Sequence, residues 1–128
     1  MDVALKEFPR ISDAEWKVMK VLWERSPLTS TEIIESLKLD TAWSPKTIHT
    51  LISRLVKKKA LKVKKESPFY LYYPLITEQK CRRVETESFL QKVYDGSFHL
   101  LVANFIKDER LSEEEIEGLK RILDDKKD

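Results

Sequence analysis

Residues 43–65, WSPKTIHTLISRLVKKKALKVKK, combine a helix start, an amphipathic helix and a run of lysines. Ser44 is a good N-cap, and Pro45 suits the first helical position because its missing N–H would have no partner within the helix. On a helical wheel the apolar side chains gather on one face: Ile48, Leu51, Ile52, Leu55 and Val56. The opposite face carries only bases and hydroxyls: Lys46, Thr47, Thr50, Ser53, Arg54 and Lys57. The stretch therefore predicts a helix with a basic outward side.

The region before this helix holds two further helix starts. Ser12 with Glu15, and Thr29 with Glu32, each match a capping box, in which two side chains satisfy backbone N–H groups of the first turn reciprocally. Apolar residues follow both starts at intervals of three and four, as on the buried face of a helix. The sequence thus predicts one helix from near Asp13 and a second, short helix behind Thr29.

Residues 61–75, LKVKKESPFYLYYPL, alternate between apolar and other side chains on both sides of Glu66-Ser67-Pro68. This alternation is the pattern of a β-hairpin. Three helices followed by a hairpin, with the third helix and the hairpin both basic, are typical of a winged helix-turn-helix, which we assign to residues 1–75. The tyrosines of the second strand are expected to pack on the helices: Tyr70, Tyr72 and Tyr73.

Residues 76–128 return to helical patterns and are assigned to a second domain. One helix is predicted to stop at Gly96, a second covers about Ser97 to Lys107, and the last begins at a capping box of Ser112 and Glu115. The middle helix is apolar nearly all round, so it must be buried. Because three short helices enclose only a thin core, we expect a homodimer formed through this domain. The expected interface comprises Phe89, Val93, Phe98, Leu101, Val102, Phe105, Ile106, Ile116, Leu119 and Leu123.

The predicted fold class is therefore mainly α with a small β-hairpin: an N-terminal winged helix-turn-helix and a C-terminal three-helix dimerisation domain. Charge is distributed unevenly between them. Residues 1–74 carry 14 Lys or Arg and 9 Asp or Glu, whereas residues 75–128 carry 10 and 13. Residues 46–65 hold eight bases and no acid. Such a local positive field is typical of a surface that binds a polyanion.

An α-helix fits the major groove of B-DNA, where side chains near its N-terminus meet the base edges. We therefore expect four residues of the third helix to read bases: Lys46, Thr47, Thr50 and Arg54. Further residues suit DNA phosphates: Ser44, Lys57, Lys58, Lys59, Lys62, Lys64 and Lys65. His49, beside this face, suits a phosphate or solvent. The alternative is a winged-helix protein-interaction module whose lysines only solubilise its surface.

The sequence lacks the patterns of an enzyme or of a metal site. Cys81 and the two histidines have no metal-ligand spacing, and no nucleophilic motif or glycine-rich phosphate loop stands out. We expect no catalytic activity, no cofactor and no metal. The single cysteine is expected in the core and fits a reducing, cytoplasmic location. The most apolar stretch, residues 98–106, is far shorter than the roughly 20 residues of a membrane span, so no membrane insertion is expected.

Three stretches together resemble the penicillinase repressor family of the BlaI/MecI type: ISDAEWKVMKVLW at 11–23, WSPKTI at 43–48 and NFIKDERLSEEEI at 104–116. The resemblance extends from about Ile11 to Leu123. It implies a dimeric transcriptional repressor whose winged helix binds a dyad operator of β-lactam-resistance genes, namely those for a β-lactamase or resistance transpeptidase and for their regulators. Position by position, it carries the base-reading role to the same four residues of the third helix.

The resemblance also implies release by proteolysis. In this family a membrane sensor of β-lactam leads to cleavage of an Asn-Phe bond in the dimerisation domain, and this chain has that pair at Asn104-Phe105. From the residues alone, Asn104 is as well explained as a polar residue at a helix interface. A repressor of the same fold that answers a different inducer is a further alternative.

One feature of this chain departs from the family pattern, and another distinguishes it from the copper-responsive relatives. Members usually have Lys-Lys-Gly before the hairpin, and here the third position is Lys59. If that residue must be left-handed, a lysine costs on the order of 1 kcal/mol, so we expect the helix to end differently and to shift the wing. Copper-responsive relatives carry paired cysteines in a C-terminal tail. This chain ends LDDKKD, which disfavours copper sensing.

Overall fold

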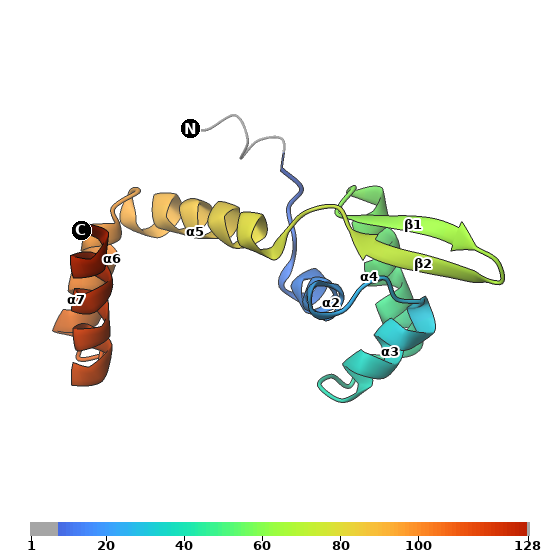
Figure 1. Cartoon of the computed structure of the whole chain (residues 1–128), viewed down its shortest axis with the longest axis horizontal. Helices are drawn as coiled ribbons and strands as arrows, with labels where there is room; N and C mark the ends of the chain where they lie inside the picture. Colours follow the sequence, from blue (N-terminus) through green and yellow to red (C-terminus); the bar gives the residue numbers. More distant parts are fainter. Residues whose placement is uncertain (1–7, 128) are drawn as a thin grey trace. The chain divides into compact units, whose positions relative to one another are not determined.

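A computed structural model of the chain describes residues 8–127, which form two compact units that divide between Val84 and Glu85 (Figure 1). The elements in chain order are α2 (Asp13–Glu24), α3 (Ser30–Lys38), α4 (Pro45–Lys57), β1 (Leu61–Glu66), β2 (Phe69–Pro74), α5 (Glu78–Tyr94), α6 (Phe98–Lys107) and α7 (Glu113–Lys127). Within the described residues, three helices and a hairpin are followed by three further helices, which confirms the predicted fold class.

Both predicted capping boxes of the first unit are present. At the start of α2, Ser12 Oγ accepts from the N–H of Glu15 at 3.1 Å, and Glu15 Oε1 accepts from the N–H of Ser12 at 2.9 Å. Thr29 and Glu32 make the same reciprocal pair at the start of α3. Each box satisfies backbone donors that a helix leaves without an internal partner, so the helix starts follow from local chemistry.

The core of the first unit lies between α2, α3, α4 and the start of β1. Its fully buried members include Met19, Leu22, Ile33, Ile48 and Leu55. The apolar face of α4 is buried as predicted, because Ile48, Leu51, Ile52 and Leu55 all belong to this core. The other face of α4 is thereby turned to solvent.

The hairpin pairs β1 with β2 in antiparallel register, from Leu61 opposite Pro74 to Glu66 opposite Phe69. Leu28 adds a short bridge to the other edge of β2: its N–H donates to Tyr72 O at 3.1 Å, and the N–H of Tyr72 donates to Leu28 O at 2.8 Å. The hairpin is therefore tied to the segment between α2 and α3 as well as to α4.

The expectation for the three tyrosines is met only in part. Tyr72 packs against the core and Tyr73 is partly buried, but Tyr70 is 54 % exposed. Tyr70 lies close to the hairpin turn, where β2 has passed beyond the helices. Its prediction as a core residue is wrong.

Helix α4 ends at a left-handed residue, Lys59, with φ of 64°. The N–H of Lys59 donates to Val56 O at 3.0 Å, and that of Ala60 donates to Leu55 O at 2.9 Å. This pair of bonds is a Schellman motif, the usual C-terminal cap formed around glycine. The helix therefore ends as it would with a glycine at this position, and the expected change in its ending is not found.

Helix α5 begins within the first unit. Cys81 is buried, as predicted, and Trp23 Nε1 donates to Ile76 O at 2.9 Å just before α5 starts. Burial, together with the carboxylate of Glu78, raises the pKa of the Cys81 thiol to about 11, so the thiol stays protonated at neutral pH. The domain boundary predicted between residues 75 and 76 stays a prediction.

The second unit has no buried side chain between residues 85 and 126. The predicted burial of α6 is not met within one chain, because Phe98 is 60 % exposed and Ile106 is 49 % exposed. The physical reason is the one anticipated from length: short helices leave most of an apolar helix uncovered. No helix of the described residues is long and apolar enough to cross a membrane.

Candidate nucleic-acid interface

The N-terminus of α4 is built as the sequence predicted. The hydroxyl of Ser44 accepts from the N–H of Thr47 at 3.2 Å, and Pro45 occupies the first turn. Four apolar side chains anchor one face in the core, and the polar side chains of the helix are exposed to solvent. The element thus presents a fixed row of polar groups on a rigid support.

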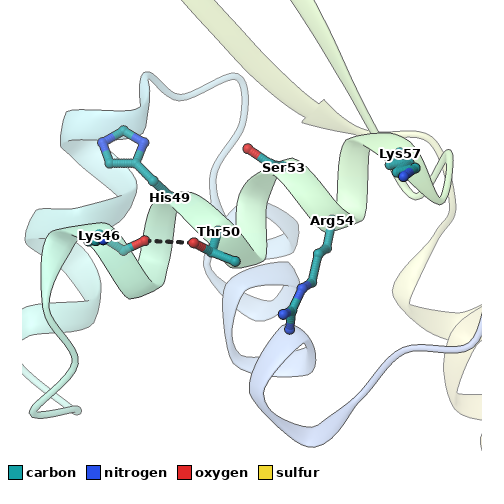
Figure 2. A pocket seen from close by; sticks show the side chains of 6 residues that line it. All are labelled: Lys46, His49, Thr50, Ser53, Arg54 and Lys57. Carbon is teal, nitrogen blue, oxygen red and sulfur yellow. Dashed lines mark hydrogen bonds between the residues drawn. The ribbon is translucent and has the colours of Figure 1, made fainter.

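A shallow depression runs along this exposed face, lined by residues of α4 alone: Lys46, His49, Thr50, Ser53, Arg54 and Lys57 (Figure 2). It brings together three of the four predicted base-reading residues and one predicted phosphate contact. Among the described residues, no carboxylate forms an ion pair with Lys46, Arg54 or Lys57. The depression is therefore an open cationic surface.

Thr47 lies outside the depression. Its hydroxyl is 3.1 Å from that of Ser44, within hydrogen-bond distance, and Ser44 also caps the helix. The fourth predicted base-reading residue is therefore engaged with the N-cap, on the flank of the surface that the other three share.

The hydroxyl of Thr50 is also committed. It donates to the carbonyl of Lys46 at 3.0 Å, the bond drawn in Figure 2. With its proton used inside the helix, Thr50 can offer a base only its oxygen lone pairs and its methyl group. Adenine and cytosine present amino donors in the major groove, and thymine presents a methyl group.

Two residues of the depression carry no definite DNA contact in the sequence prediction. Ser53 was given none, and His49 was expected to face either a phosphate or solvent. Both were visible on the helical wheel beside the basic face. The missed signal is the spacing of four, which aligns His49, Ser53 and Lys57 in one row on the helix.

The structure gives Lys58 partners within its own unit. Its ammonium group donates to Glu15 Oε1 at 2.6 Å and to Arg10 O at 2.7 Å. The Glu15 side chain is only 2 % exposed, so this lysine neutralises a buried carboxylate of α2. Lys58 is therefore held within its own unit, and its contact with a DNA phosphate stays a prediction.

The charge state of Glu15 reflects two opposing effects. Burial favours the neutral acid, but hydrogen bonds from Lys58 and from the backbone and hydroxyl of Ser12 outweigh it, so the pKa of Glu15 is lowered. Its second oxygen, Oε2, is buried without a hydrogen-bond partner among the described residues. The carboxylate therefore depends on Lys58 for its compensation.

The lysines of the hairpin do not share one face. Successive side chains of a strand point to opposite sides, so Lys62 and Lys64 lie on one face and Lys65 lies on the other, with Val63. Lys64 pairs with Glu66 at 3.4 Å, and the ammonium of Lys65 lies 6.0 Å from the centre of the Tyr70 ring. All three lysines are exposed.

The predicted cleavage bond lies in the second half of α6. The carbonyl of Asn104 accepts from the N–H of Asp108 at 3.0 Å, and that of Phe105 accepts from the N–H of Arg110 at 2.8 Å. Both side chains are exposed. Glu109, the residue after the C-cap Asp108, is left-handed with φ of 55°. The bond is thus accessible at its side chains but tied into helical hydrogen bonds.

The predicted interface residues of the second unit are all at least partly open to solvent. Six are exposed large apolar side chains: Phe89, Val93, Phe98, Phe105, Ile106 and Leu123. The other four are partly buried: Leu101, Val102, Ile116 and Leu119. Within the described residues no cluster of potential metal ligands occurs.

Comparison with known proteins gives one consistent family. A sequence profile described as penicillinase repressor matches residues 11–125. The chain is 43% identical over 123 residues to the penicillinase repressor of Bacillus licheniformis, covering 96% of both chains. It is 43% identical over 116 residues to the methicillin resistance regulatory protein MecI of Staphylococcus aureus, covering 91% of this chain and 94% of that one.

A solved structure extends the comparison to the fold. The monomeric form of Bacillus licheniformis BlaI, in complex with the blaP half-operator, matches with a TM-score of 0.52 and 47% identity. The match covers 56% of this chain and 88% of that chain.

Proposed function

The chain belongs to the penicillinase repressor family, and from this premise we propose that it represses transcription by binding operator DNA through the exposed face of α4. The observation that carries the proposal is the open cationic surface of that helix. Three cations that form no ion pair with any described acidic residue lie on a face opposite four buried apolar residues. A rigid helix with this polarity suits the major groove.

Base reading is proposed for Lys46, Thr47, Thr50 and Arg54. Lysine and arginine can donate to O6 and N7 of guanine. Thr50 accepts a hydrogen bond or contacts a thymine methyl, because its own proton is held by the carbonyl of Lys46. Thr47 lies next to the N-cap and reaches DNA from the flank of the depression.

Phosphate contacts are proposed for residues at both ends of α4 and on the hairpin: Ser44, Lys57, Lys59, Lys62, Lys64 and Lys65. All are exposed. Each phosphate that a lysine neutralises adds about −0.9 to the slope of log affinity against log salt concentration. These contacts set register and grip without reading sequence.

We propose that residues 76–128 form the dimerisation domain of a homodimer. The support is the uncovered apolar surface of the second unit, where no side chain is buried between residues 85 and 126. The solved relative was described as a monomeric form on a half-operator, which supports one chain per half of a dyad. A second copy supplies cover of matching chemistry and a second winged helix.

Release is proposed to follow cleavage of the Asn104-Phe105 bond by the inducing protease of a membrane β-lactam sensor system. Since the bond lies within α6, the last turns of that helix must open first. The left-handed Glu109 next to these turns costs about 1 kcal/mol in the folded state, which reduces the cost of opening. The cut would divide the apolar interface and leave monomers.

Operator binding is tested with two duplexes of equal length, one carrying two inverted copies of the blaP half-operator and one of random sequence. Replacing Lys46 and Arg54 by alanine is expected to reduce the preference for the operator, by about 1–3 kcal/mol for each contact. Lys20→Ala, which removes an exposed lysine of α2, is the matched control. Unchanged affinity of the Lys46 and Arg54 variants would favour the protein-interaction module instead.

Cleavage is tested by mass spectrometry of the chain recovered from cells before and after β-lactam treatment. Fragments ending at Asn104 and starting at Phe105 are expected. An intact chain during full induction of the regulated genes would refute the cleavage step while leaving the operator proposal standing.

A further inference from the structure

Two parallel rows of side chains line the depression on α4. One row holds Lys46, Thr50 and Arg54, and the other holds His49, Ser53 and Lys57. Figure 2 shows His49 and Ser53 projecting from one side of the helix and Arg54 from the other. The first row contains the proposed base-reading residues. The second row so far has a role only for Lys57.

Nothing in the fold uses the imidazole of His49. It is exposed, and it makes no hydrogen bond, ion pair or ring contact with another residue of the described chain. Helices α2 and α3 and strand β1 pack against α4, but none of their described residues lines the depression. The charged groups that share it with His49 are Lys46, Arg54 and Lys57, all of them cations.

We propose that His49, Ser53 and Lys57 hold the phosphate backbone at the border of the major groove, and that His49 does so as a cation. The inference rests on the proposed binding of DNA. It follows from the geometry of a helix in a groove: a row beside the base-reading row meets the strand that flanks the bases. A serine hydroxyl and two cationic groups are chemically suited to phosphate oxygens.

Cationic binding by His49 makes DNA affinity depend on pH. Histidine changes its charge between about pH 8 and pH 5, and a phosphate beside the imidazole favours the protonated form. The complex therefore binds more protons than the free protein, so affinity rises as pH falls. Because the chain has only two histidines, the effect can be assigned to one residue.

The test is fluorescence anisotropy of the full-length protein with the same two duplexes, at pH 6 and pH 8 and at several salt concentrations. From pH 8 to pH 6 the wild-type affinity is expected to rise several-fold, with a salt slope steeper by about 0.9 per bound chain. His49→Gln should lose both effects, and His49→Lys should keep the low-pH affinity at both pH values. Ser53→Ala should lower affinity roughly fivefold without changing the pH dependence.

His99→Gln is the matched control, because it removes the other histidine, which lies in the second unit. A His49→Gln protein that keeps the wild-type pH dependence would overturn the inference, as would a wild type whose affinity does not change with pH. A phosphate contact does not depend on sequence, so the pH effect is expected on the random duplex too. If the wild type showed no preference for the operator, the proposed function would be overturned. The pH dependence on the random duplex would still test the role of His49.

Discussion

Lys59 occupies a backbone conformation that favours glycine, at the junction between α4 and the hairpin. Its φ is 64°, and the two hydrogen bonds of the Schellman motif hold it there. A side chain with a Cβ atom is strained in this region by about 1 kcal/mol. The residue also places an exposed ammonium group beside the proposed DNA-binding face. The lysine thus combines a local cost with a charge that suits phosphate binding.

Lys59→Gly is expected to stabilise the first unit by about 0.5–1 kcal/mol, because relief of the left-handed strain outweighs the extra conformational entropy that glycine gives the unfolded chain. It should also reduce the salt slope of DNA binding by about 0.9 per chain. Urea denaturation and anisotropy measure the two effects. Lys59→Ala is the control: it removes the same charge but keeps the left-handed strain, so it should weaken DNA binding without raising stability.

Lys58→Met leaves the buried carboxylate of Glu15 without its cation. Because Lys58 is 36 % exposed, we expect a loss of about 2 kcal/mol at pH 7, less than for a fully buried pair. In the wild type the pKa of Glu15 is lowered, so its contribution is present above the usual glutamate range and is lost as pH falls through the folded pKa.

The pH dependence of this variant has the opposite sign. Without Lys58, burial should raise the pKa of Glu15 above its unfolded value, so the variant loses stability as pH rises. The difference from wild type should therefore be largest at pH 7 and shrink toward pH 4. Urea midpoints across this range are the measurement. A difference that grows at low pH would contradict the assignment of Glu15 and Lys58 as a compensated pair.

Among the elements, α4 has an N-terminus that serves both the fold and the proposed binding. The hydroxyl of Ser44 caps the helix through the N–H of Thr47 and also lies next to the hydroxyl of Thr47. A cap that is itself a proposed phosphate contact couples helix stability to DNA binding. Two substitutions at one position can separate these effects.

Ser44→Ala is expected to destabilise the first unit by about 1 kcal/mol, since the first turn loses its cap. Ser44→Asp should keep the stability, because aspartate caps as well as serine, but its carboxylate repels phosphates and should lower DNA affinity roughly tenfold. Thermal unfolding and anisotropy give the two values. If Ser44→Asp binds DNA as tightly as wild type, Ser44 does not lie near a phosphate.

At the scale of the whole molecule, the two units differ in how much apolar surface each can bury by itself. The first unit encloses a core, and the buried Cys81 and the bond from Trp23 to Ile76 include the start of α5 in it. The second unit leaves Phe89, Phe98 and Leu123 about half exposed. The first unit, about two thirds of the chain, is therefore expected to fold alone, and the second is expected to need a partner.

Phe98→Asp is expected to convert the homodimer to monomers. Phe98 begins α6, where aspartate is compatible with the helix, so the change acts on the apolar surface rather than on helix formation. Sedimentation should give half the wild-type mass. Affinity for the two-site duplex should fall by about 100-fold or more, while affinity for a single half-operator should be unchanged.

Leu39→Asp provides the matched control for this experiment, because Leu39 is 87 % exposed but lies in the first unit. It should leave the sedimentation mass and the two-site affinity as in wild type. A Phe98→Asp protein that still sediments as a dimer would show that α6 does not form the interface.

The helix starts, the hairpin and the polarity of α4 were determined by the sequence itself. Capping boxes act over three residues and helical faces over four, so these interactions can be read along the chain. The same range of interaction places Lys46, Thr50 and Arg54 on one surface. It also explains why the fold class could be predicted without any long-range contact.

Only the tertiary structure decided which lysines have no partner within the described chain and so remain available to bind phosphate. Lys58 turns to Glu15, 43 residues away in the sequence, and no local pattern distinguishes it from Lys57 or Lys59. The exposure of Tyr70 is likewise a tertiary result, because it lies beyond the helices that cover Tyr72. A run of like charges sets the sign of a surface, but the direction of each side chain depends on partners that folding brings together.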